Sequence, residues 1–187
     1  MSEITNTIKT PAEDIAFVLE QLDKSEAAVQ QILSTLTEEQ FIFKADEETW
    51  SISENLEHVI LFDRGVFGTI VKLSKNMRDT YPEGTPAKEV LMKIMTKRAT
   101  KVKAPEFAVP TGKYTNKEEL FNQFVAQHNT IKTFVQNFDG DLRKVAFKHF
   151  LIGLIDGIGW LTNIAGHCMR HVIQMKEIME AETFPKV

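Results

Sequence analysis

Residues 160–174, WLTNIAGHCMRHVIQ, carry the pattern around which the rest of the sequence is organised. Two histidines, His167 and His171, stand four positions apart in it. On an α-helix each residue advances by about 100°, so the two side chains project from nearly the same line, one turn apart. Two imidazoles in this arrangement can bind one metal ion. They can equally be two partly buried histidines that hydrogen-bond inside a helical core.

Apolar residues recur at helical spacing in four long segments of the sequence. We expect helices over residues 11–36, 52–73, 116–138 and from 156 or 157 to 180. A shorter helix is expected after Pro86, between the second and third long helices, and no segment predicts a convincing strand. The sequence therefore predicts an all-α fold, a four-helix bundle with one additional short helix, in a single domain over residues 1–187.

Capping signals and glycines refine this picture. Capping boxes are expected at Thr10–Glu13, Ser51–Glu54 and Thr115–Glu118, each at the start of a long helix. Gly65 and Gly68 interrupt the second long helix, where each glycine lowers helix propensity by roughly 1 kcal/mol. We expect them to mark the close approach of a neighbour or to thin one wall of a cavity.

Composition excludes several classes of function. The net charge of -4 is unfavourable for a general binder of nucleic acid or of anionic membranes. The single cysteine, Cys168, rules out an internal disulfide and any multi-cysteine metal site. The N-terminus does not read as a signal peptide, and the most apolar stretch, residues 150–160, is too short and broken to span a bilayer. A cytoplasmic protein without membrane or nucleic-acid partners is therefore expected.

A third histidine completes a candidate metal site. His58 lies about two turns into the second long helix, beside its apolar stripe. Three imidazoles from two helices suit zinc, nickel, cobalt or iron, and three protein ligands leave a position for water or substrate. The segment lacks the glutamate of the His-Glu-x-x-His metalloprotease motif, because Cys168 occupies that position. This excludes a zinc protease of that type.

Two motifs resemble the DinB/YfiT-like superfamily. They are WSISENLEH at residues 50–58 and the pattern WLxxIAxHxxRHxxQ at residues 160–174, and the segments KAP at 103–105 and PTG at 110–112 are also similar to one branch. The resemblance implies an up-down-down-up four-helix bundle, often a dimer. It implies a divalent ion, nickel or zinc, held by His58, His167 and His171.

The activities known in that superfamily diverge. They include metal-dependent hydrolases, bacillithiol S-transferases and mycothiol-dependent enzymes, so the resemblance implies activation of water or of a low-molecular-weight thiol for attack on a small-molecule substrate. The alternative is a non-catalytic metal-binding or stress-associated bundle. No general acid or base can be assigned from the sequence, and the catalytic residues are left unknown.

Other polar residues have more ordinary explanations. Gln174, one turn after His171, is expected either to hold a ligand imidazole or to make a polar core contact. His128 and His149 are expected to be structural histidines, and Cys168 a buried, unreactive thiol. Glu54 is explained by its capping role.

Overall fold

The computed structural model describes residues 9–97 and 103–186. Its long helices are α1 (Ala12–Ser34), α3 (Ile52–Ser74), α5 (Lys117–Asn137) and α6 (Gly157–Met179), which confirms the predicted bundle. The short elements are α2 (Glu38–Ile42), α4 (Lys88–Thr96), two 3₁₀ turns, η1 (Glu106–Ala108) and η2 (Leu142–Lys144), and two strands, β1 (Ala146–His149) and β2 (Gly153–Asp156). None of the described helices is both long and apolar enough to cross a membrane.

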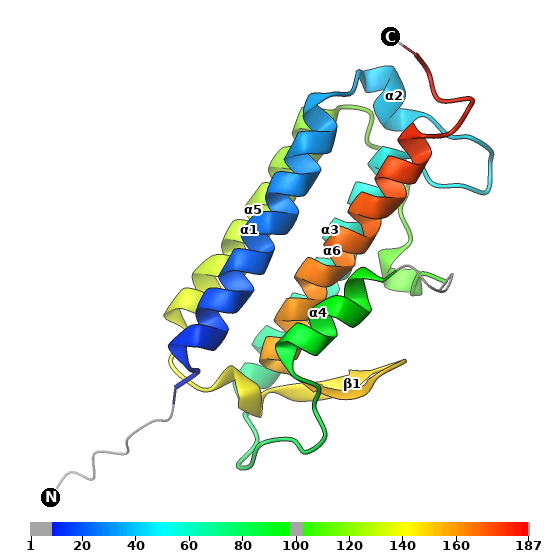
Figure 1. Cartoon of the computed structure of the whole chain (residues 1–187). Coiled ribbons are helices and arrows are strands. Elements are labelled where there is room, and N and C mark those ends of the chain that lie inside the picture. The colour runs from blue at the N-terminus through cyan, green and yellow to red at the C-terminus, as the bar shows by residue number, and fades with distance from the viewer. Residues whose placement is uncertain (1–8, 98–102, 187) are drawn as a thin grey trace, which may run out of the picture.

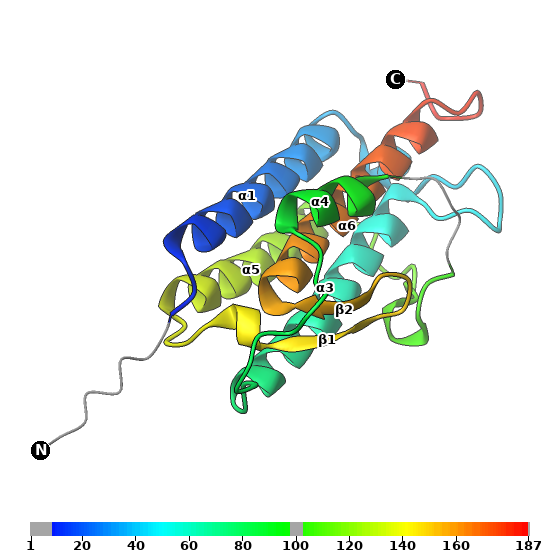
Figure 2. The same ribbon diagram turned by 60° about the horizontal axis from the view of Figure 1, so that its bottom comes forward.

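The four long helices form a closed bundle in which α1 and α3 each pack against both α5 and α6 (Figures 1 and 2). The chain runs up in α1, down in α3 and α5, and up again in α6. Contacts at both ends fix these directions: Lys117 N donates to Glu38 Oε2 at 2.9 Å, and Thr10 N donates to Gly140 O at 3.0 Å. The topology is the up-down-down-up order that the resemblance implies.

Because α3 and α5 run in the same direction, the chain between them must return along the length of the bundle. This crossover contains α4, which packs on α6, and η1, which packs on α3. Glycines on α6 permit the close packing of α4, since a Cβ on Gly166 would lie 2.7 Å from Met95 Cβ. The crossover therefore covers the face of the bundle where α3 and α6 meet.

The β-hairpin contradicts the expectation of no strand. Strands β1 and β2 pair antiparallel from Ala146↔Asp156 to His149↔Gly153, and Gly153 has a positive φ of 92°. Trp160 holds the hairpin to the bundle: its ring stacks on Phe147 with centroids 4.1 Å apart, and its indole N–H donates to Phe147 O at 3.1 Å. A two-stranded ribbon this short depends on such tertiary contacts. Local sequence therefore predicts it poorly.

The helix caps follow the sequence in one case and depart from it in two. Ser51 forms the predicted capping box with Glu54. Thr10 does not cap α1, because its hydroxyl instead bonds Gly140 O at 3.1 Å and Leu142 N at 2.8 Å, joining the start of α1 to the turn before η2. The cap of α5 is Asn116, one residue later than expected, and its side chain accepts from Glu119 N.

The apolar core has two parts that meet at a polar layer. One part contains Leu22 and Val66, and the other contains Val29 and Val59. Between these levels, Asp63 on α3 and His128 on α5 are fully buried. Phe62, the residue before Asp63 on α3, stacks on His167 of α6, so the candidate site lies beside this polar layer.

Candidate metal centre

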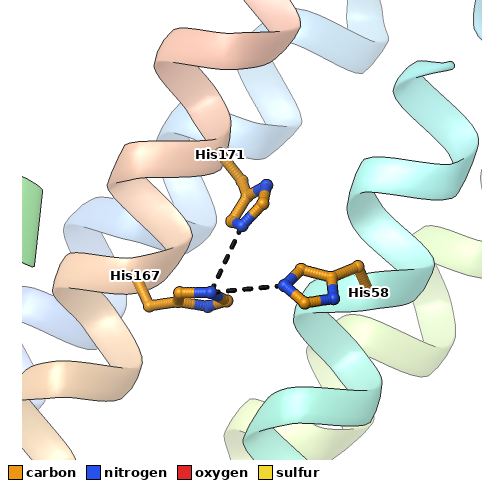
Figure 3. Close-up of side chains that lie close together, drawn as sticks. All are labelled: His58, His167 and His171. Atoms are coloured by element: carbon orange, nitrogen blue, oxygen red, sulfur yellow. Dashed lines mark hydrogen bonds between the residues drawn. The ribbon is translucent and has the colours of Figure 1, made fainter. Parts of the chain in front are cut away.

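Three histidines from two helices face one another (Figure 3). His58 projects from the second turn of α3, and His167 and His171 project from successive turns of α6. His167 Nε2 lies 3.3 Å from His58 Nε2 and 3.2 Å from His171 Nε2. His58 and His171 are buried, and His167 is partly exposed.

The nitrogens on the far side of two rings are held by acceptors. His58 Nδ1–H donates to Ala108 O at 2.6 Å, and His171 Nδ1–H donates to Asn55 Oδ1 at 2.9 Å. The Asn55 amide is itself oriented, since its NH₂ donates to Ser51 O at 2.8 Å. A neutral imidazole that carries its proton on Nδ1 has a lone pair on Nε2. Both rings therefore present unprotonated Nε2 atoms to the centre of the trio.

This donor set fits a divalent cation. Converging lone pairs repel each other unless a proton or a cation lies between them, and neutral imidazole is a preferred ligand of zinc and nickel. A tetrahedral ion with Zn–N bonds of about 2.0–2.1 Å separates neighbouring nitrogens by about 3.3–3.4 Å. The two separations from His167 Nε2, 3.3 and 3.2 Å, match this spacing, and all three ligand atoms lie within 4.8 Å of one another. The acceptors behind His58 and His171 are of the kind that orient metal-binding imidazoles.

Burial favours the neutral forms of His58 and His167. Loss of solvent lowers the pKa of His58, although its bond to Ala108 O acts in the opposite direction. The pKa of His167 is held well below its usual range, first by burial and then by the neighbouring His171 and His58. A metal ion must compete with protons for each nitrogen, so lowered pKa values favour its binding at neutral pH.

The chain carries the sequence pattern of a known family. The family model of the DinB superfamily matches residues 21–175, a range that includes all three histidines. The chain belongs to the DinB superfamily. Among solved structures it is similar to YfiT from Bacillus subtilis, described as a probable metal-dependent hydrolase with an unusual four-helix bundle topology. The two share 12% identity with a TM-score of 0.58 over 96% of this chain and 92% of YfiT, a likeness of fold. A comparison with curated proteins found no match.

In this DinB superfamily chain, aromatic rings close two sides of the trio. Trp50 lies against His58, with ring centroids 4.8 Å apart, and against His171 at 6.4 Å. Phe62, one turn beyond His58, stacks on His167 with centroids 4.0 Å apart and an interplanar angle of 27°. These rings restrict imidazole rotation and keep bulk water from the faces of the rings.

A buried carboxylate, Glu57, fixes the crossover segment that contains Ala108. Glu57 is 3% exposed, and its Oε2 accepts from Thr111 N at 2.9 Å and from Gly112 N at 3.0 Å. Its Oε1 accepts from the Thr111 hydroxyl at 2.6 Å. These bonds tie the crossover to α3 a few residues beyond Ala108, the residue whose carbonyl orients His58. Sequence reasoning missed the roles of Glu57, Asn55 and Ala108. The only local signal was that Asn55 and Glu57 lie within the quoted motif at residues 50–58.

The other residues singled out in the sequence lie in different surroundings. Gln174 is half-buried, and its side chain forms no hydrogen bond among the described residues, so its predicted role beside a ligand stays a prediction. His128 is fully buried beside Asp63, with Nε2 3.4 Å from Asp63 Oδ2, and does not join the trio. Cys168 is buried, and burial raises its thiol pKa well above the usual range, as suits the expected unreactive thiol. His149 lies on the hairpin.

The lowered pKa of His167 predicts a pH dependence of stability in the metal-free protein. Below the ordinary histidine pKa of 6.5 the unfolded chain binds a proton at this position that the folded chain excludes. Stability is therefore lost as pH falls, by up to about 1.4 kcal/mol per pH unit. The measurement is the free energy of unfolding by urea, with chelator present, of the wild type and of His167→Gln at several pH values from 7.5 to 5.5. The difference between the two proteins removes the contribution of distant carboxylates, which both share. A pH-independent difference would contradict the lowered pKa.

Proposed function

We propose that this protein is a metal-dependent hydrolase that holds one divalent ion, zinc or nickel, through the Nε2 atoms of His58, His167 and His171. The observation that carries this proposal is the convergence of three Nε2 atoms, with the Nδ1 atoms of His58 and His171 engaged by acceptors. Membership of the DinB superfamily and the likeness of fold to YfiT support it.

The chemistry would come from the ion and its placement from the protein. A divalent ion with three protein ligands lowers the pKa of water or of a thiol toward neutrality and polarises a carbonyl oxygen. The Ala108 carbonyl and the Asn55 side chain fix the tautomers of His58 and His171. The rings of Trp50 and Phe62 shield the faces of the imidazoles. Three protein ligands would leave a position of the ion open, and the partial exposure of His167 would give a small substrate access to it.

The test compares chelated protein with protein reloaded with Zn²⁺ or Ni²⁺ on a panel of p-nitrophenyl esters and p-nitroanilides. We expect hydrolysis that returns on reloading and is lost in His58→Ala. Lys176→Ala, an exposed substitution on α6, serves as the control and should retain the activity. Equal rates in the loaded and the chelated protein would overturn the proposal.

A second arm of the same experiment supplies the nucleophile that the superfamily resemblance offers as the alternative to water. It adds cysteine or glutathione together with 1-chloro-2,4-dinitrobenzene and measures thioether formation. A metal-dependent rate in this arm, with no ester or anilide hydrolysis in the first, would assign thiol transfer to the site and contradict the hydrolase proposal.

A further inference from the structure

A pocket of about 550 Å³ adjoins the candidate metal site through the ring of Phe62. Phe62 forms part of the pocket lining, and the same ring stacks on His167 of the candidate metal site. Pro105 and Phe107, which precede Ala108 in the crossover, line it as well. A further wall comes from the β-hairpin and Trp160. A volume of several hundred Å³ is typical of small-molecule sites.

The pocket lining combines aromatic rings with positive charge. Phe62, Phe107, Phe147, Phe150 and Trp160 supply five aromatic side chains. The charged residues of the lining are Lys103 and Lys148, both exposed, and no carboxylate lines the pocket. Neither lysine forms an ion pair among residues 9–97 and 103–186. Flat apolar walls with two unpaired ammonium groups favour a planar apolar ligand that carries negative charge.

His149 also lines this pocket. It is 7% exposed, and its Nδ1 accepts from Leu151 N at 3.2 Å. A neutral ring whose Nδ1 accepts must carry its proton on Nε2. Burial lowers the pKa of His149, which keeps the ring in this neutral form. The remaining N–H can donate to an oxygen of a bound molecule.

We propose that this pocket binds an aromatic carboxylate, with the aromatic group between the phenylalanines and Trp160 and the carboxylate toward Lys103 and Lys148. The inference rests on the proposed function in one respect: the bound molecule would be the acidic part of the substrate on which the metal centre acts. Binding in the pocket is a separate property, because none of the three histidines belongs to the lining.

Two glycines on α3 provide a matched pair of variants. Gly65 lines the pocket, and a Cβ built on it would lie 2.6 Å from Phe107 Cε2, so a larger side chain must displace that ring and fill space. Gly68, one turn along the same helix, has nothing within 4 Å of its Cβ position. Leucine at either site raises helix propensity, which favours α3 in both variants; circular dichroism checks that both are folded.

The experiment is calorimetric titration of metal-free protein, with chelator present, by 2-naphthoate and by neutral 2-naphthamide. We expect naphthoate to bind about fivefold more tightly than the amide, a modest factor because both lysines are solvent-exposed. Lys148→Glu should abolish this preference. Gly65→Leu should weaken binding of both probes by about tenfold or more, and Gly68→Leu should bind them as the wild type does.

The remaining outcomes also decide the matter. His167→Ala should keep naphthoate binding, because the pocket and the metal centre are separate. The protein could therefore bind metal without binding naphthoate in the pocket, or bind naphthoate without binding metal. Equal affinity for the two probes in the wild type, absence of binding, or equal weakening by Gly65→Leu and Gly68→Leu would overturn the proposal.

Discussion

Saturating Zn²⁺ or Ni²⁺ is expected to raise the midpoint of thermal unfolding of the chelated protein by about 8–16 °C. An ion that binds only the folded state at 1,000 times its dissociation constant stabilises it by about 4 kcal/mol. In a domain of 150–250 residues each kcal/mol shifts the midpoint by about 2–4 °C. The ligands come from α3 and α6, so the ion would add a link between two helices that are already joined by packing and by the Asn55–His171 hydrogen bond. Scanning calorimetry on chelated and reloaded protein measures the shift.

Two comparisons make this prediction specific. Mg²⁺ prefers oxygen ligands and retains its water, so it should leave the midpoint unchanged at the same concentration. His171→Ala should remove most of the shift, whereas Lys176→Ala, five residues further along α6 and exposed, should preserve it. An equal shift with Mg²⁺, or a full shift in His171→Ala, would place the ion elsewhere on the protein.

Replacing Glu57 by alanine should weaken metal binding by about 10–100-fold, although Glu57 is not one of the three histidines. The carboxylate accepts three hydrogen bonds from Thr111 and Gly112, and these hold the crossover that places Ala108 O against His58. The substitution removes the acceptor of two backbone N–H groups and one hydroxyl on the exposed residues Thr111 and Gly112, so unfolding free energy should also fall by about 1–3 kcal/mol. Titration of the chelated variant with Zn²⁺ against a competing chelator measures the affinity.

Glu54→Ala is the matched control for Glu57→Ala. Glu54 lies on the same helix, three residues earlier, where it accepts from Ser51 N and pairs with Lys44. Its loss removes half of a capping box, at a cost of about 0.5–2 kcal/mol, and should leave zinc affinity within about twofold of the wild type. Similar losses of affinity in both variants would show that general destabilisation of α3, and not the position of the crossover, controls metal binding.

The fold was predictable where local sequence governs it. The period of apolar residues predicted all four long helices, and the Ser51–Glu54 pair predicted the start of α3 because both partners lie within one turn. Prediction was wrong where distant groups compete. The Thr10 hydroxyl does not cap α1 because it bonds instead with Gly140 O and Leu142 N, about 130 positions along the chain. The hairpin depends on Trp160, which no pattern within residues 146–156 reveals.

In the candidate site, too, the residues within local motifs were predictable and the long-range contacts were not. The three histidines could be named from helical spacing and from family resemblance, because each lies in a regular helix within a recognisable motif. Their supporting contacts span 50 positions for His58 and Ala108 and 116 positions for His171 and Asn55. A carbonyl such as that of Ala108 has no residue-type signature, so only the fold of the crossover identifies it. The pocket is equally invisible in sequence, since it joins α3, the crossover and the unpredicted hairpin.

The metal content of purified protein tests the central claim most directly. Inductively coupled plasma mass spectrometry on the wild type, His167→Ala and His149→Ala, each incubated with zinc and gel-filtered, compares a member of the trio with a histidine outside it. We predict about one ion per chain in the wild type and in His149→Ala, and less than about a tenth of that in His167→Ala. Equal content in the wild type and His167→Ala, or no metal in either, would show that the three imidazoles are a hydrogen-bonded cluster of the core.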